Sequence, residues 1–246
     1  MARTRLYIDD KLQPGVELDV SGDKARYLGK VLRLRVGDQI AVFNGRDGEF
    51  DAQLSRISKH EVELLLGAAR ETQTESDLKI HLVQGISRGE RMDLVVQKAT
   101  ELGVKRITPV LTEYGVVKLA AERATKRQEH WQKIAISACE QSGRTRPPLV
   151  EVPLTLKEWF GQRSQRADVE LILQPGAATN LSAIAAPQTK VCLMIGPEGG
   201  FSQSEYEDAG LCGFEPVSLG PRVLRTETAA ISALAIAQSL WGDLQA

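Results

Sequence analysis

The chain has 246 residues, of which 42% are hydrophobic and 26% are charged, and its formal net charge is −1. This composition is that of one or two globular domains, and it excludes collagen-like, disordered and strongly basic proteins. The sequence contains neither a run of roughly 18 apolar residues, which a membrane span requires, nor an apolar signal-peptide core. We therefore expect a cytoplasmic protein without a membrane partner.

The cysteine and histidine residues give no sign of a metal site. Three cysteines and three histidines are scattered along the chain, without a CxxC pair or two histidines at helical spacing. Such spacings indicate neither a disulfide framework nor a zinc site. We expect isolated side chains and no bound metal.

Charge is distributed unevenly along the chain. Residues 79–147 have a net charge of +6, and residues 148–246 have a net charge of −5. A basic middle segment in a neutral chain is compatible with a local polyanion-binding face, and equally with a solvated helix surface.

Residues 1–70 are expected to form a small β-barrel with one helix. Short apolar or alternating runs predict five strands, and NGRDG at residues 44–48 has the chemistry of a hairpin turn. Ser21 is the expected cap of a helix over residues 22–34. Its apolar face is formed by Ala25, Leu28 and Leu32. The polar residues 71–78 that follow are expected to be a linker.

From residue 79 onward, predicted strands alternate with predicted helices. Gly103 is the expected stop of one helix, and Ser202 with Glu205 forms the capping box of another. Thr226 is the expected cap of the last helix. This alternation predicts an α/β domain over residues 79–246 with a mostly parallel sheet.

Three of these predicted strands end in loops that contain glycine and proline. The loops are LILQPGAATN (171–180), MIGPEGG (194–200) and SLGPRVLRTETAA (218–230). Ligands of open α/β sheets bind at the carboxyl ends of strands, although Gly-Pro also simply turns a chain. The sequence contains neither GxGxxG nor GxxxxGK[ST], and these loops are poor in lysine. A neutral or cationic nucleoside ligand fits better than a triphosphate.

Four long motifs resemble the RsmE family, the bacterial small-subunit (16S) ribosomal RNA uracil-N3 methyltransferases of the SPOUT superfamily. In chain order they are SRGERMDLVVQKATELGV (87–104), WQKIAISACEQSGRTRPP (131–148), LMIGPEGGFSQSE (193–205) and LGPRVLRTETAAISAL (219–234). The resemblance implies a C-terminal SPOUT α/β domain with a deep trefoil knot and an N-terminal PUA-like β-barrel that binds RNA. It also implies S-adenosylmethionine as cofactor, a homodimer, and ribosomal RNA or the assembled small subunit as substrate.

The resemblance places the cofactor at the three loops. We expect Gly196, Gly199 and Gly220 where a Cβ would collide with the cofactor or its enclosing loop. The residues expected to bind the cofactor are Leu173, Gln174, Pro175, Ile195, Gly196, Pro197, Glu198, Gly199, Gly200, Leu219, Gly220, Pro221, Val223, Leu224, Arg225, Thr226 and Thr228.

Arginines supply the expected RNA contacts, since a guanidinium matches phosphate geometry. For each of them, a solvated surface arginine is an equal alternative. The expected RNA-binding residues are Arg3, Arg5, Arg33, Arg35, Arg88, Arg91, Arg144, Arg146 and Arg222.

Methylation at N3 of uracil requires loss of the N3 proton and stabilisation of the developing anion. We expect Arg225 to stabilise the anion, because cations are poorly placed at a helix start for helical reasons alone. Either Glu227 or Glu140 is expected to accept or orient the proton; their alternatives are helix-dipole placement and an ion pair with Arg144. Two other functions stay open: a SPOUT enzyme for ribose 2′-O or another base, and a non-catalytic RNA-binding ribosome factor.

Overall fold

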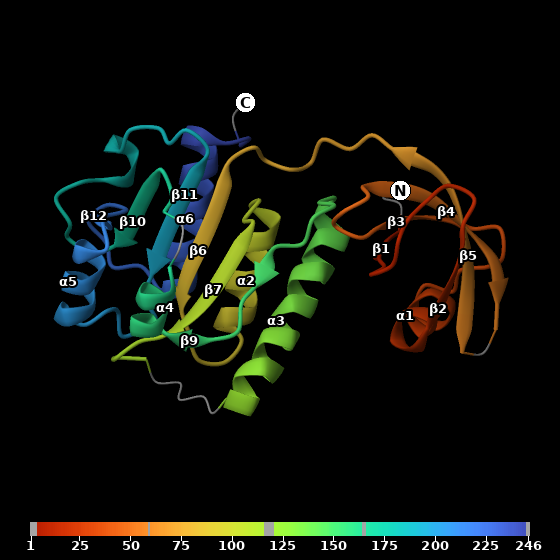
Figure 1. The fold of residues 1–246 in the computed structure, drawn as a ribbon, viewed down its shortest axis with the longest axis horizontal. Coiled ribbons are helices and arrows are strands. Elements are labelled where there is room, and N and C mark those ends of the chain that lie inside the picture. The colour runs from red at the N-terminus through yellow and green to blue at the C-terminus, as the bar shows by residue number, and fades with distance from the viewer. Residues whose placement is uncertain (1–3, 59, 116–120, 164–165, 245–246) are drawn as a thin grey trace. The chain divides into compact units, whose positions relative to one another are not determined.

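The computed structural model describes residues 4–58, 60–115, 121–163 and 166–244, which divide into two compact units (Figure 1). Unit 1 comprises Met1–Glu75 and Cys139–Arg146. Unit 2 comprises Ser76–Ala138 and Pro147–Ala246. The segment expected to be a linker is thus divided between the two units.

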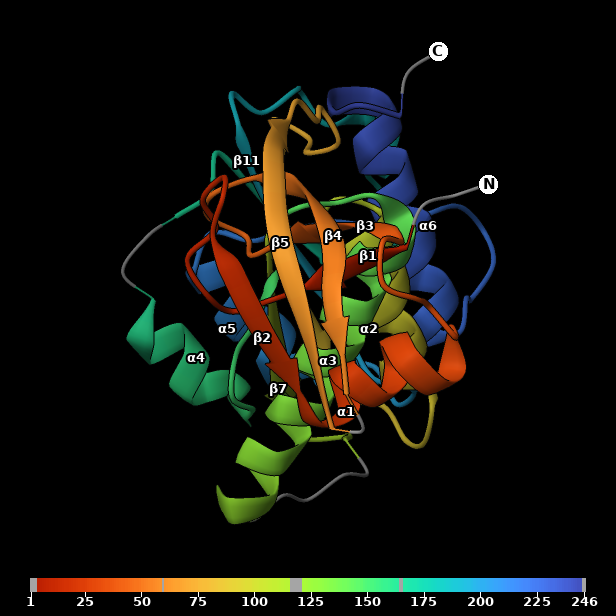
Figure 2. The same ribbon diagram turned by 90° about the vertical axis from the view of Figure 1, so that its right-hand side faces the viewer.

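Unit 1 is built on a five-stranded sheet in the order β1-β3-β4-β5-β2 (Figure 2). β1 and β3 are parallel, and the other neighbours are antiparallel. Because β1 and β2 form its two edges, the expected barrel is a half-barrel. The strands are β1 (Arg5–Tyr7), β2 (Glu17–Ser21), β3 (Gln39–Phe43), β4 (Glu49–Ile57) and β5 (Glu61–Arg70).

The predicted hairpin joins β3 to β4. The side-chain carbonyl of Asn44 accepts hydrogen bonds from the backbone N–H groups of Arg46 (2.9 Å) and Asp47 (2.8 Å). Gly48 has a φ of 94°, which favours glycine. The NGRDG segment therefore forms the turn for the reasons that its sequence indicates.

The helix of unit 1 is shorter than predicted. An α-helical turn, α1 (Gly22–Arg26), leads into a π-helical turn, η1 (Tyr27–Val31), and Ser21 makes no side-chain cap. Leu32 N–H donates to the carbonyl of Tyr27, five residues earlier, and Arg33 leaves the helix with a φ of 55°. The wider π turn overrides the regular α-helical spacing assumed for residues 22–34.

Unit 2 is built on a seven-stranded sheet in the order β12-β10-β11-β6-β7-β8, with β9 also paired to β7. Its neighbouring strands are parallel, as the alternation of strands and helices predicts. The strands are β6 (Lys79–Gly85), β7 (Arg106–Leu111), β8 (Leu149–Val150), β9 (Leu154–Thr155), β10 (Val169–Leu173), β11 (Lys190–Ile195) and β12 (Glu215–Val217).

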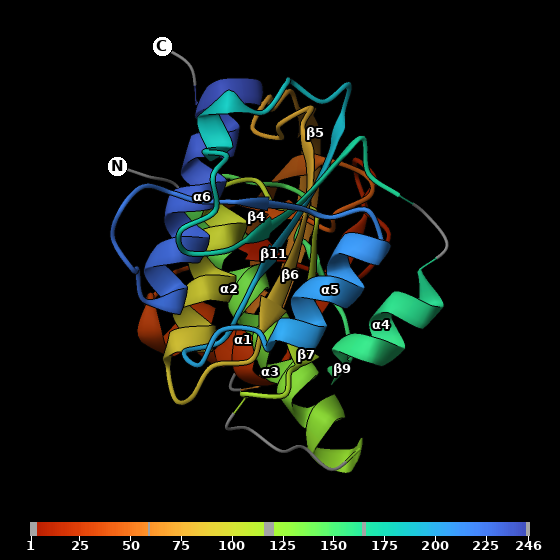
Figure 3. The same cartoon turned by 90° about the vertical axis from the view of Figure 1, so that its left-hand side faces the viewer.

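Helices cover both faces of this sheet (Figure 3). α2 (Arg91–Glu101), α6 (Thr226–Trp241) and part of α3 (Ala121–Ser142) cover one face, and α4 (Leu156–Gln162) and α5 (Gln203–Leu211) cover the other. Residues of β11 alternate between the two cores, as strand geometry requires. A short 3-10 turn, η2 (Leu181–Ala183), follows β10.

The ends of these helices follow the sequence signals in part. Gly103, with a φ of 81°, follows α2, and the capping box of Ser202 and Glu205 begins α5, as predicted. The prediction for α6 was wrong: Arg225 occupies the N-cap position and Thr226 is the first helical residue. Within the described residues, no helix is long and apolar enough to cross a membrane. The deep trefoil knot that the family resemblance implies for unit 2 stays a prediction.

Candidate active site

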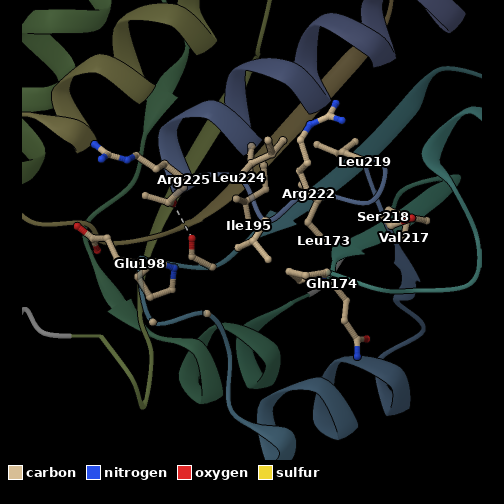
Figure 4. A pocket seen from close by; sticks show the side chains of 18 of the residues that line it. Leu173, Gln174, Ile195, Glu198, Val217, Ser218, Leu219, Arg222, Leu224 and Arg225 are labelled. Atoms are coloured by element: carbon tan, nitrogen blue, oxygen red, sulfur yellow. Dashed lines mark hydrogen bonds between the residues drawn. The ribbon is translucent and has the colours of Figure 1, made fainter.

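A cavity of about 540 Å³ lies where three loops leave the carboxyl ends of β10, β11 and β12 (Figure 4). These strands are neighbours in the sheet, so their loops converge although they are separated in sequence. Apolar side chains form much of the wall, including Leu173, Ile195, Leu219 and Leu224. The three Gly-Pro segments of the sequence thus build one site.

The cavity brings together the residues expected at the cofactor, except Pro221 and Thr228, which do not line it. Arg91 and Arg222, expected at RNA, also line it. Four lining residues were missed from the sequence: Tyr206, Val217, Ser218 and Ala229. Of these, Val217 and Ser218 directly precede the LGPR segment, so their position at the end of a predicted strand could have identified them.

Hydrogen bonds tie the start of α6 to the floor of the site. The Thr226 hydroxyl donates to the carbonyl of Gly196 (2.6 Å), and the Gln84 side-chain amide donates to the Thr226 oxygen (3.0 Å). Thr226 and Gln84 are both buried. The hydroxyl that was expected to cap α6 therefore connects the last loop to the loop after β11 and to the end of β6.

The glycines of the loops serve different purposes. A Cβ on Gly196 would lie 3.1 Å from the backbone of Gly200, within the enclosing loop as expected. A Cβ on Gly199 would instead lie 2.9 Å from the carbonyl oxygen of Tyr114, in the segment after β7. Gly220 has open space but a φ of 107°. The expected collision at the cofactor loop thus holds for Gly196 alone among these three.

Arg91, on α2, lies between two carboxylates. Its Nη1 is 2.7 Å from Oε1 of Glu198, and its Nε is 3.9 Å from Oε1 of Glu227. Arg88 adds a backbone N–H bond to the same Glu198 oxygen (3.1 Å). Burial raises the pKa of Glu198, but these hydrogen bonds and the Arg91 charge outweigh it and leave the pKa below its usual value. Glu198 is therefore held ionised.

Neither carboxylate expected to accept the proton lines the cavity. The Glu227 side chain is 14% exposed, and its Oε2 is buried without a hydrogen-bond partner among the described residues. Glu140 belongs to unit 1 and accepts the backbone N–H of Tyr7 (2.9 Å). Burial raises the pKa of Glu140. Glu198 is the one carboxylate among the described lining residues.

Arg222 and Arg225 are exposed and line the cavity. Their side chains diverge: Arg225 lies on the side of Glu198, and Arg222 lies on the side of Leu219 (Figure 4). Within the described part of the chain, neither guanidinium makes a hydrogen bond or an ion pair. Both are available to a bound anion.

Two arginines expected at RNA are instead interior groups of unit 1. Arg5 pairs with Glu49 and donates to the carbonyls of Glu140 and Arg144 (3.4 and 2.9 Å). The Arg144 side chain is 3% exposed and pairs with Glu75 (2.8 Å). Because Arg144 is buried, the Arg5 side chain is only 11% exposed and both are committed to internal partners, the structure argues against a phosphate contact.

Four other arginines expected at RNA are exposed, so they can still contact a phosphate. These are Arg33, Arg35, Arg88 and Arg146. Arg3 lies outside the described residues. No group of three or more His, Cys, Asp or Glu within the described ranges could hold a metal ion.

Two family models match the chain. One, described as an RNA methyltransferase domain, matches residues 74–238, and one, described as an RNA methyltransferase PUA domain, matches residues 20–66. Among curated proteins, the chain is 36% identical to the ribosomal RNA small subunit methyltransferase E of Buchnera aphidicola from Schizaphis graminum, covering 98% of this chain and 97% of the relative. The protein of the same name from Bacillus subtilis is 31% identical, covering 91% and 90%.

Solved structures resemble the whole chain. A Legionella pneumophila protein, described as a methyltransferase in complex with SAM, is 42% identical with a TM-score of 0.94, covering 99% of this chain and 100% of the other. The ribosomal RNA small subunit methyltransferase E of Neisseria gonorrhoeae, bound to S-adenosyl methionine, is 39% identical with a TM-score of 0.92 and the same coverage.

Proposed function

Because the chain belongs to the RNA methyltransferase family, we propose that it transfers a methyl group from S-adenosylmethionine to N3 of a uridine in small-subunit (16S) ribosomal RNA. The single observation that carries this proposal is the cavity formed by the loops after β10, β11 and β12. It lies in a chain that aligns over nearly its full length with proteins named ribosomal RNA small subunit methyltransferase E.

The residues of the cavity fit S-adenosylmethionine. The cavity volume of about 540 Å³ suits a nucleoside-sized ligand, and leucine and isoleucine side chains offer an apolar wall for an adenine ring. A Cβ on Gly196 would fit only tightly, 3.1 Å from the backbone of Gly200, so the loop between these residues is compact. The ionised Glu198 is the lining group that can attract a positively charged sulfur. When bound, the cofactor supplies a methyl group on a positively charged sulfur.

Arg225 is the group we propose to act on the uracil. Loss of the N3 proton would place negative charge on the uracil oxygens, and N3 would then take the methyl group as its bond to the cofactor sulfur breaks, which leaves a neutral thioether. A free guanidinium at the cavity can stabilise that charge. Glu198 is held ionised by Arg91, so it is a weak proton acceptor. We propose that the proton passes to solvent, which favours faster reaction at higher pH.

The two units divide the work in this proposal. Unit 1, which contains the PUA-domain match, binds RNA, and Arg33 and Arg35 at its exposed helix end are the proposed phosphate contacts. Unit 2 holds the cofactor in the proposed knot. A ribosomal RNA substrate places the reaction in the cytoplasm.

A homodimer is also part of the proposal. α6 buries Ala230, Ala233, Leu234 and Ala237 in its own unit. Apolar groups near both of its ends stay exposed, with Val223 at 82% and Leu240 at 39%. A second copy of the chain would cover them. Sedimentation is expected to show a dimer at micromolar concentration, and a monomer would contradict it.

The function is tested on small subunits from cells that lack the protein. Incubation with purified protein and S-adenosylmethionine, followed by nucleoside mass spectrometry, is expected to yield N3-methyluridine. A 2′-O-methylated nucleoside or another methylated base would reassign the target. Binding to the subunit without any methylated product would make the protein a non-catalytic factor.

A further inference from the structure

A second cavity, of about 800 Å³, lies in unit 2 at the amino-terminal ends of the parallel strands. It is bordered by the first residues of β6, β7 and β11, which are Lys79, Arg106 and Lys190, whereas the candidate active site lies at the carboxyl ends of the strands. β6 has seven residues, so about 20 Å separate the amino-terminal ends of the strands from their carboxyl ends. We name this second site the basic cavity.

Positive charge dominates the lining of the basic cavity. Its basic residues are Lys79, Lys105, Arg106, Arg163, Arg166 and Lys190, and its acidic residues are Glu151 and Glu170. The surrounding segment 148–246 is acidic overall, and the whole chain has a net charge of −1. The basic cavity is therefore a local concentration of positive charge and does not reflect a generally basic surface.

Internal pairing accounts for only part of this charge. Arg163 pairs with Glu170, and its guanidinium lies 4.8 Å from the ring centres of Trp159 and Phe214, so it is a packing residue. Nη1 of Arg106 is 3.4 Å from Oε1 of Glu151, but the Arg106 side chain is 52% exposed, so solvent screens the pair.

Two lysines are held side by side at the rim. Lys190 of β11 and Lys79 of β6 are direct partners in the parallel register, and both are exposed. Like charges held at neighbouring strand positions repel each other. Asp168 of the adjoining loop accepts the backbone N–H groups of Thr189 and Lys190, and these bonds together with the Lys190 charge lower the pKa of its carboxyl. An anion bound between the two lysines would relieve their repulsion.

His81 and Cys192 line the basic cavity without adding charge to it. Burial, with the charges of Arg106 and Arg163, lowers the pKa of His81 to about 3, and its Nε2 is bonded to the Thr108 hydroxyl (2.7 Å). Burial raises the pKa of the Cys192 thiol. The charge of the cavity therefore comes from its lysines, arginines and glutamates.

The aromatic lining distinguishes between two modes of RNA binding. Trp159 is the one Trp, Tyr or Phe among the described lining residues, and it is 6% exposed beneath Arg163. Proteins that bind single strands stack bases on accessible aromatic rings. Recognition of double-stranded RNA uses phosphate contacts and needs no such ring.

We propose that the basic cavity binds the phosphate backbone of a double-stranded segment of the substrate RNA, about 20 Å from the methylated nucleotide. This inference rests on the proposed function for the identity of the RNA, and on the charges of the cavity for the contact itself. Through this contact, the enzyme recognises a structured region of the RNA and not an isolated uridine.

The test replaces the facing lysines without creating a new ion pair. Lys79→Gln/Lys190→Gln is compared with Lys126→Gln/Lys133→Gln, in which the same charge is removed from exposed positions of α3 outside the cavity. Binding of a plain 16-base-pair RNA duplex is measured against salt concentration. The cavity variant is expected to lose about two units of log-log slope, roughly one per phosphate contact, while the control keeps its slope.

Methylation of small subunits gives the second readout. The cavity variant is expected to raise KM several-fold with kcat unchanged, because the contact lies far from the reacting atoms. Equal slopes and equal KM in the two double variants would overturn the proposal. Since removal of repelling charges should not destabilise unit 2, a normal melting temperature is expected for both.

Two further outcomes separate the possible explanations. If the wild-type protein methylates no RNA but the cavity variant alone loses duplex affinity, the proposed function fails and this inference stands. If inorganic phosphate binds the wild-type protein more tightly than the cavity variant while both bind the duplex with equal slopes, the cavity binds a small free anion, and the RNA assignment is wrong.

Discussion

The hydroxyl of Thr226 donates a 2.6 Å hydrogen bond to the carbonyl oxygen of Gly196, and this bond joins the first turn of α6 to the loop after β11. Thirty residues separate the two partners, and both belong to the lining of the active-site cavity. This buried side chain therefore holds the end of the last loop, whose beginning is held by the backbone bond from Ser218 to Thr179.

Thr226→Val is expected to destabilise unit 2 by about 1–3 kcal/mol, because the Gly196 carbonyl and the Gln84 amide lose their shared partner. Urea unfolding measures this change. Affinity for S-adenosylmethionine should fall as well. Thr226→Ser keeps the hydroxyl and is expected to restore most of the stability. A loss in Thr226→Ser with normal stability in Thr226→Val would show that the methyl group, and not the bond, is what matters.

Arg225→Ala is expected to lower single-turnover methylation about 10²–10³-fold with little change in cofactor affinity, since one donor to a developing oxyanion is removed. Arg225→Lys should rescue the rate in part, because an ammonium lacks the bidentate fork. Raising the pH should offset part of the defect by ionising more of the uracil. Arg222→Ala, at the other free arginine of the cavity, is the matched control, and an Arg225 variant with normal turnover would refute the assignment.

Arg91→Ala is expected to weaken S-adenosylmethionine binding by up to about tenfold, or 1.4 kcal/mol. The substitution frees Glu198 and leaves the half-buried Glu227 carboxylate without its nearest cation. Arg88→Ala is the control, because Arg88 reaches Glu198 through its backbone N–H. Calorimetric affinities that fall equally in both variants would remove the special role of the Arg91 side chain.

Gly85→Ala is expected to displace the loop after β11, since the added Cβ would lie 2.3 Å from Cδ of Pro197. Overpacking of this kind costs about 1–3 kcal/mol. Thermal unfolding should register the loss, and cofactor affinity should fall with it. Gly161→Ala, in α4, places a Cβ in open space, so it should keep cofactor affinity and, as a helical substitution, should not lower stability. A stable Gly85 variant with normal affinity would show that the loop yields freely.

Acid is expected to destabilise unit 2 through His81. Its folded pKa of about 3 lies below the unfolded value of about 6.5, so the unfolded state binds the extra proton between these values. The stability that the neutral imidazole supports is complete above about pH 6.5 and is lost as the pH falls toward 3, by at most about 1.4 kcal/mol per pH unit. His81→Gln should flatten this slope in urea titrations at several pH values, and parallel slopes would exclude the contribution.

The sequence by itself determined the elements and the location of the site. Alternation of apolar residues and turn chemistry act over a few neighbours, so β3, β4, the NGRDG turn and the capping box of Ser202 could be predicted. Because carboxyl ends of parallel strands lie at one edge of a sheet, three loops with glycine and proline favoured a shared site, and the family resemblance placed the cofactor there.

Only the tertiary structure decided which polar side chains are free. Arg5, Arg144 and Arg225 look alike in the sequence, yet the first two are interior groups of unit 1 and the third lines the cavity. Lys79 and Lys190 are far apart along the chain, and strand pairing makes them neighbours. Burial and partners arise from contacts distant in sequence, so local patterns could not distinguish structural charges from those available to a ligand.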